Sequence, residues 1–571
     1  MNDVSVVAAE LRPVALDEGH PRKWLILSAV SLGMFMALLD VTIVNIAIPA
    51  IITDLHTTVT QVSWVLNAYS LVLAAFFLSM GRVSDRFGQK RVFLAGLVLF
   101  TLFSLFCGLA PSIGWLIAFR AGQGIGGAAL STVSLAIVLG AFPKRQQGTA
   151  VGLWGALGTI AAAIGPTLGG LLVTYASWHW IFFVNVPVGI AAVAFALAVI
   201  PEHRAAAATG GVDLPGIVIS MAGLFMLTLA LIEGNTWGWT SAPVLALFAG
   251  AVASYPLFVW WELRTAHAMF PIKLLRIRSF TAANSAMMFI GMAMGGTFLL
   301  VVIFLVSVLG YSELRAALAL TVMPVTAFFI APNVGRLVDH IGPRIPAAVG
   351  AASFTAGLVL LAQLDGSARL VDVLWRVIFI GAGMGFTMPT LSAAAMGSLP
   401  PQVRGVGSGA LNTLRQMGFT LGVAVLVAIF SHTVAQNAQQ ATRQAVAYVN
   451  AQAQLPAAAK AKIAANLEKS AAAAAKSGGG AASQLRTNAL ANAPQAPPGS
   501  PQAQAQQRLA AQIGAIYRDS IGRSFKWPFY AAALAALLAI VPALLTGRRL
   551  GEHEGHEEMN RAERAAAAAG K

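Results

Sequence analysis

Long apolar stretches separated by short polar segments dominate the chain. Many of these stretches run for about 18 to 25 residues with almost no charge, which is the length an α-helix needs to cross a bilayer. The pattern predicts fourteen membrane helices, at 24–49, 61–80, 92–110, 115–139, 148–175, 180–200, 213–232, 242–262, 280–309, 317–334, 347–364, 371–396, 405–432 and 525–546.

The fold class that follows is an all-α membrane protein. Residues 1–23 and 547–571 are polar tails on either side of the bundle. Spans 1–6 form a six-helix bundle over 24–200, spans 7–8 form an inserted pair over 213–262, and the remaining spans form a second six-helix bundle over 280–546.

One long polar segment, 433–523, interrupts the second bundle before its last helix. It is rich in Ala, Gln and Asn, and Gly478–Gly480 and the Pro494–Pro501 cluster divide it. This composition favours a partly disordered connector over a defined binding domain. The Glu- and His-rich stretch 552–558 is interpreted as a solvated charged tail rather than as a metal site.

Charge changes this picture by giving the bundle an orientation. The net charge is +15, but the basic residues lie in short loops between spans, so the positive-inside rule explains them better than a nucleic-acid surface does. If both termini are cytoplasmic, nearly all loop Arg and Lys residues fall on the cytoplasmic side, whereas the short outer loops carry only Arg315 and Arg369. Asp213 and Glu233, which bracket the seventh span, are expected to be interfacial anchors.

The two bundles repeat each other. The segment GRVSDRFG at 81–88 returns as GRLVDHIG at 335–342, an offset of 254 residues. GPTLG at 165–169 matches GFTLG at 418–422, and Arg120 matches Arg376. Parallel repeats of this kind build transporters whose halves open a central site to alternate sides. The second loop has His340 and Pro343 where the first has Arg86 and Gln89, and we expect it to make the weaker contact.

Several motifs resemble a known family. The loop GRVSDRFGQKR at 81–91 resembles the signature loop of the major facilitator superfamily. LDVTIVNIAIP at 39–49, RAGQG at 120–124 and WHWIFFVNVP at 178–187 resemble its fourteen-helix drug/proton antiporter branch, which includes multidrug resistance exporters. Gly155 to Gly170, ending GPTLGG, resembles the antiporter motif of that superfamily.

Two charged residues within the spans are candidates for proton coupling. Asp40 lies inside the first span, where a carboxylate must be paired, protonated or in contact with water, and Arg120 in the fourth span is its natural counter-charge. A structural ion pair is the alternative. The resemblance implies that the proton gradient drives transport and that no cofactor is needed.

The resemblance also implies two conformational elements. The first is a gating loop that contains Gly81, Asp85, Arg86, Gly88 and Arg91. The second is a hinge in the fifth span, where a proline removes a backbone hydrogen bond and glycines allow close packing. It consists of Gly158, Gly165, Pro166, Gly169 and Gly170.

Candidates for the substrate cavity are polar or aromatic residues within the spans. They are Asn45, Asn67, Tyr69, Gln123, Arg376 and Arg415. The two arginines could each bind an anionic group or cap a backbone carbonyl, and the sequence does not decide between these.

No Walker A pattern, metal-ligand spacing or nucleophile elbow occurs, so neither an ATP-driven pump nor an enzyme is indicated. The sequence therefore predicts a proton-coupled antiporter that exports small amphipathic compounds across the inner membrane. A carrier of one specific metabolite and a non-transporting receptor or scaffold are the alternatives. The resemblance further suggests a periplasmic adaptor and an outer-membrane channel as partners of the 433–523 segment.

Overall fold

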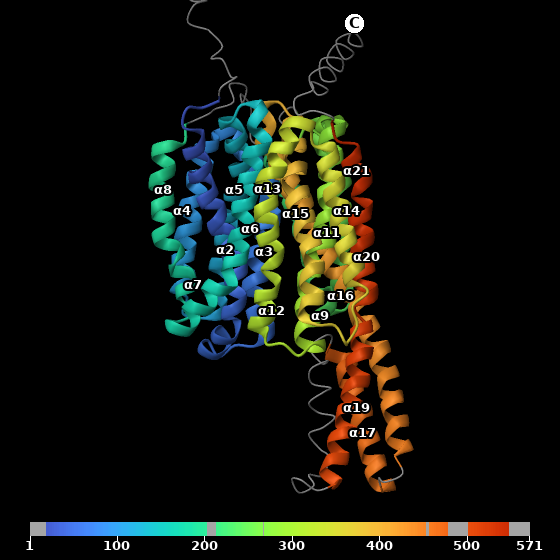
Figure 1. Cartoon of the computed structure of the whole chain (residues 1–571). Coiled ribbons are helices and arrows are strands. Elements are labelled where there is room, and N and C mark those ends of the chain that lie inside the picture. Colours follow the sequence, from blue (N-terminus) through green and yellow to red (C-terminus); the bar gives the residue numbers. More distant parts are fainter. Residues whose placement is uncertain (1–18, 202–212, 266–267, 453–455, 478–500, 548–571) are drawn as a thin grey trace, which may run out of the picture.

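A computed structural model describes residues 19–201, 213–265, 268–452, 456–477 and 501–547. Fourteen helices in this part of the chain are long and apolar enough to cross a membrane. The ends of the described chain, Gly19 and Gly547, lie at one face of the bundle, which we call the terminal face (Figure 1).

Six spans form the N-terminal half. They are α2 (Lys23–Asp54), α3 (Val59–Phe87), α4 (Gln89–Gly108), α5 (Ile113–Ala141), α6 (Gln147–Tyr175) and the pair α7 (Trp180–Phe183) and α8 (Asn185–Val199). The helix α6 continues without interruption through Pro166.

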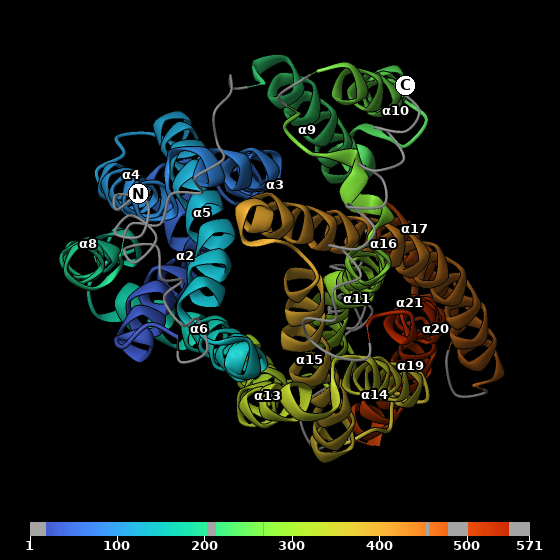
Figure 2. The same ribbon diagram turned by 90° about the horizontal axis from the view of Figure 1, so that it is seen from above.

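Six spans form the C-terminal half. They are α11 (Arg278–Ile303), α12 (Glu313–Leu320) with α13 (Val322–Ile341), α14 (Arg344–Leu361), α15 (Leu370–Gly397), α16 (Arg404–Ala451), and α20 (Lys526–Leu538) with α21 (Ile540–Leu544). Seen along the spans, the two halves lie side by side (Figure 2).

The connector, predicted to be partly disordered, is largely helical in its described residues. The helix α16 is 48 residues long and projects beyond the bundle, where it packs against α17 (Ala457–Ser477) and α19 (Pro501–Arg523) (Figure 1). Ala438, Ala441, Ala445 and Val449 recur every three or four residues and are buried, so one face of α16 forms an apolar seam. The hydroxyls of Thr442 and Tyr517 join α16 to α19 at 2.7 Å. Alanine and glutamine, which are abundant in this segment, favour helices.

The inserted pair, α9 (Leu214–Trp237) and α10 (Ala242–Arg264), lies on the rim, where α9 contacts α3 and α16 (Figure 2). Asp213, expected to be an interfacial anchor, is 6% exposed, caps α9 through the Gly216 amide at 2.9 Å and accepts the Trp261 indole N–H at 2.7 Å. Glu262, 5% exposed, accepts the backbone amides of Met269 and Phe270. These bonds fasten the insert to the segment that leads into α11.

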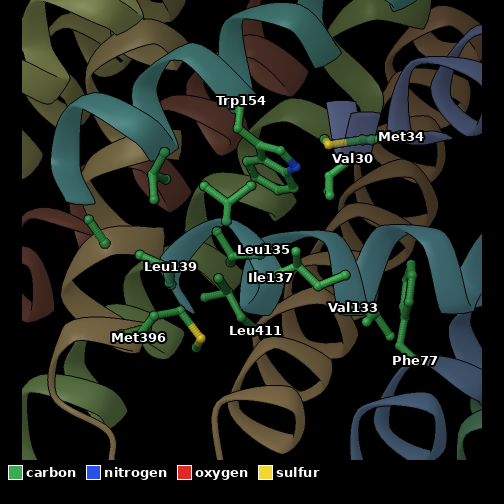
Figure 3. Close-up of a cluster of buried hydrophobic side chains, with 14 of the residues drawn as sticks. Val30, Met34, Phe77, Val133, Leu135, Ile137, Leu139, Trp154, Met396 and Leu411 are labelled. Atoms are coloured by element: carbon green, nitrogen blue, oxygen red, sulfur yellow. The ribbon is translucent and has the colours of Figure 1, made fainter. Parts of the chain in front are cut away.

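The apolar core shows where the halves meet. One cluster at the terminal side includes residues of both halves, among them Phe77, Val133 and Trp154 from the first half and Met396 and Leu411 from the second (Figure 3). Toward the opposite face the core separates into two clusters, one in each half. The structure is therefore closed at the terminal face, and we call the shared cluster the terminal plug.

Candidate functional site

The most completely paired charges in the described spans are Asp40 and Arg120. Both side chains are buried, at 0% and 1% exposure, and they form an ion pair between α2 and α5. The Arg120 Nε also donates to the Val65 carbonyl at 3.1 Å, and its guanidinium lies 4.2 Å from the Tyr69 ring centroid. A buried charge in a membrane protein needs such compensation, because unpaired burial is costly.

Two amides complete the site around Asp40. Gln123 donates to the Asp40 Oδ1 at 3.0 Å and accepts from Arg120 at 2.8 Å. Asn185, at the start of α8, donates to the same Oδ1 at 3.5 Å and to the Ser104 hydroxyl at 3.0 Å. We call Asp40, Arg120, Gln123, Asn185 and Tyr69 the charge cluster.

Sequence reasoning missed Asn185 as a site residue. It lies in the WHWIFFVNVP motif that carried the resemblance, and an amide at a helix start within the membrane was the available signal. Conversely, Tyr69 and Gln123 were expected to line the substrate cavity, but both are at most 1% exposed and belong to the charge cluster. Their hydrogen bonds and ring contact serve the ion pair instead.

The glycines of the hinge motif set the position of α2. A Cβ added to Gly158 would lie 2.8 Å from the Met34 Cε, and one added to Gly169 would lie 2.9 Å from the Ile43 carbonyl oxygen. Gly165 lies even closer to Thr42, whereas Gly170 has nothing nearer than 4.0 Å. The α6 backbone therefore contacts α2 on both sides of Asp40.

The gating loop forms a clamp between the halves. Asp85, near the end of α3, accepts the Gly405 and Val406 amides at 2.9 and 2.8 Å. These amides are the free N–H groups at the start of α16, where the helix dipole favours an anion. Gly81 lies against Gly405 so closely that a Cβ at Gly81 would overlap the Gly405 carbonyl.

The other loop residues surround this clamp. Gly88 has a φ of +101°, a conformation that favours glycine, and it ends α3 and begins α4. The Arg86 guanidinium lies 5.3 Å from the Phe87 ring centroid, and Arg91 lies in the first turn of α4.

The second signature loop, expected to be the weaker of the two, forms an equivalent clamp. Asp339, near the end of α13, accepts the Gly148 amide at 2.7 Å, the Thr149 amide at 2.9 Å and the Thr149 hydroxyl at 2.6 Å. It thus accepts three hydrogen bonds where Asp85 accepts two. The second loop differs from the first at His340 and Pro343 but keeps the carboxylate, Asp339, and this carboxylate makes the contact.

The remaining cavity candidates are scattered. Asn45 is exposed and donates to the Val41 carbonyl of its own helix at 3.1 Å, and Asn67 is half-buried on α3. Arg376 caps the Leu360 and Asp372 carbonyls at 3.0 and 2.5 Å and lies over Trp375, so it is held by backbone rather than presented to a cavity. Arg415 is half-buried at the middle of the membrane part of α16.

Comparisons with known proteins agree with this architecture. Residues 30–423 match the Major Facilitator Superfamily. The chain is 35% identical over 408 residues to the multidrug resistance protein Stp of Mycobacterium tuberculosis (strain CDC 1551 / Oshkosh), with 71% of this chain and 76% of Stp aligned. It is 32% identical to the tetracenomycin C resistance and export protein of Streptomyces glaucescens, covering 72% and 77%, and 30% identical to the riboflavin transporter RibZ of Clostridioides difficile (strain 630), covering 73% and 90%.

A solved structure shares the fold. The human organic anion transporter MFSD10 (TETRAN) superposes with a TM-score of 0.53 at 15% identity, covering 71% of this chain and 93% of that one. Fourteen apolar helices, two related halves, paired signature loops and a family match over most of the spans lead to one conclusion: the chain is a multi-pass membrane transporter that belongs to the Major Facilitator Superfamily.

Proposed function

We propose that this transporter is a proton-coupled antiporter that exports small amphipathic compounds by alternating access. The observation that carries the proposal is the charge cluster: a carboxylate and a guanidinium, both buried within the spans, between two helices of the same half. A carboxylate in this setting can exchange a proton only when its partners move, which ties protonation to conformation.

The chemistry of coupling follows from the contacts of Asp40. While ionised, it holds Arg120, Gln123 and Asn185 together through charge-assisted hydrogen bonds. Protonation removes the charge that holds Arg120, so α2 and α5 gain freedom to shift. Because Asp40 is 0% exposed in the state closed at the terminal face, it loads or releases its proton in another state.

The two clamps supply the conformational half of the cycle. Asp85 and Asp339 each hold a helix start of the opposite half at the terminal face. Opening that face requires both sets of bonds to break, and closing it restores them. The terminal plug would then part to admit the substrate.

Orientation and energy source belong to the same proposal. The positive-inside pattern supports cytoplasmic termini in the cell inner membrane, with the proton gradient rather than a cofactor as the energy source. The helices α17 and α19 would then project into the periplasm, where a periplasmic adaptor leading to an outer-membrane channel could meet them. Relatives named for resistance and export support the outward direction of transport.

The test is gradient-driven dye movement in everted vesicles, with a cationic, a neutral and an anionic amphipathic dye. We expect Asp40→Asn to abolish proton-dependent movement of every dye that the native protein transports. Asp54→Asn is the matched control, because Asp54 lies on the same helix but is exposed and accepts the Trp178 indole N–H instead of an ion-pair partner.

Three outcomes separate the alternatives. Unchanged coupling in Asp40→Asn would overturn the role of the charge cluster. Equal loss in Asp54→Asn would show that any acid on α2 matters. If the native protein moves none of the dyes, a carrier of one metabolite is favoured, as the name of the riboflavin transporter among the relatives suggests.

A further inference from the structure

The α16 helix changes its surroundings along its length. All ten residues from Arg404 to Thr413 are buried, whereas Leu414 to Met417 are all half-buried. Leu411 is the last residue of α16 that belongs to the terminal plug. Arg415 is the first charged residue of α16 after it.

Arg415 differs from the other arginines of the spans in its partners. Its Nη2 donates to the Asn412 Oδ1 at 2.9 Å, and none of the ion pairs among the described residues includes it. Arg120 has a carboxylate and Arg376 has two carbonyls. A guanidinium has five N–H donors, and a cation within a membrane protein is costly unless an anion or water compensates it.

Arg415 is also connected to the opposite half. Asn412 donates to the Ser408 carbonyl at 3.0 Å, and the Ser408 hydroxyl donates to the Thr132 carbonyl of α5 at 2.7 Å. Residues 408, 412 and 415 are spaced by four and three, so they lie on one face of α16. Because Ser408 contacts α5 in the N-terminal half, that face is directed toward the contact between the halves.

The helix backbone at Arg415 is closely packed. Gly291 of α11 lies against the Arg415 carbonyl, and Gly418 lies against the Met288 carbonyl. The backbones of α11 and α16 therefore touch on either side of Arg415.

We propose that Arg415 binds the anionic group of the transported molecule, so that the substrates are amphipathic compounds with a carboxylate or an ionised phenol. This inference rests on the proposed transport function and adds the chemical class of the cargo. A planar guanidinium pairs with a carboxylate through two parallel hydrogen bonds. Asn412 and Ser408 place that contact next to the junction of the halves. Binding of the substrate and closure of the transporter can therefore influence each other there.

The test is equilibrium binding to the purified full-length protein in nanodiscs, with empty nanodiscs subtracted. The probes are pyrenebutyrate and pyrenebutanol, which share the ring system and chain and differ in the charged end. We expect the native protein to bind the carboxylate at least about tenfold more tightly than the alcohol, a preference of one decade in the dissociation constant. Arg415→Gln should abolish that preference. Arg415→Lys should keep part of it, because lysine retains the charge but cannot form the two parallel hydrogen bonds of a guanidinium.

Arg376→Gln is the matched control, since Arg376 is held by backbone carbonyls in the same half. Its preference should stay native. A native preference in Arg415→Gln, or no preference in the native protein, would overturn the inference. If Arg415→Gln does not fold, a reduced preference in Arg415→Lys supports the inference, whereas an undiminished preference in Arg415→Lys refutes a forked contact.

Binding needs no gradient, so this result is separate from the test of antiport. A retained charge preference together with absent proton-driven transport would refute antiport alone. Proton-driven movement of cationic dyes, with no preference for the carboxylate probe, would refute the anion site alone.

Discussion

The two halves carry equivalent arginines in different surroundings. Arg120 and Arg376 both lie about two turns inside the helix that begins at the face opposite the termini. Arg120 pairs with Asp40, but the position 254 residues after Asp40 is Met294, and Arg376 binds carbonyls instead. The clamps, in contrast, recur in both halves with a carboxylate on a helix start. The contacts between the halves at the terminal face are therefore built symmetrically, whereas the buried ion pair belongs to one half.

Replacing each arginine in turn tests this difference between the halves, and the loss of stability should differ most between these two variants. Arg120→Gln leaves Asp40 buried without its cation, and we expect a loss of about 3–5 kcal/mol in the free energy of unfolding. Arg376→Gln removes bonds to carbonyls at a half-buried position and should cost about 1 kcal/mol. Denaturant unfolding of the purified variants measures both.

The double variant Asp40→Asn with Arg120→Gln sharpens the same test. It removes both charges, so it should recover much of the stability that Arg120→Gln loses. Equal losses in the two single arginine variants would show that the halves are not electrostatically different.

The clamps should respond alike. Asp85→Asn and Asp339→Asn each replace charge-assisted bonds to backbone amides, and each should weaken the closed terminal face by about 1.5–3 kcal/mol. Spin labels on the exposed residues Arg145 and Gln402, in a Cys107→Ser background, report the separation of the halves by double electron–electron resonance. We expect a longer distance distribution in both variants. Widening in Asp85→Asn alone would show that the second loop is not a working clamp.

The glycine contacts should give the smallest effect. A Cβ at Gly81 meets the Gly405 backbone, so Gly81→Ala should destabilise the closed terminal face by about 1–3 kcal/mol. Gly155→Ala is its control, because a Cβ there meets nothing within 4 Å and alanine favours the helix. The distance distribution between the same two spin labels should widen in the first variant and remain unchanged in the second. Widening in both would point to general disturbance of the helices.

Much of this organisation could be predicted from the sequence. The spans, the repeat and the pairing of Asp40 with Arg120 follow from apolar length, motif spacing and the cost of a lone membrane charge. The partners of Asp85 could not, because they are backbone amides of Gly405 and Val406, which have no side-chain signature. The hydrogen-bond partners of Arg376 depend on which helix ends pack beside it, and the sequence alone does not show that packing.

The length of α16 has a mechanical consequence. Its 48 residues span about 72 Å, with one end held by Asp85 and the other in the seam with α19. A rod that pivots by 10° over that length moves its far tip by about 12 Å. If the halves rock as proposed, the projecting helices would amplify any movement at the terminal face, and a partner that held their tip still would also restrain that movement.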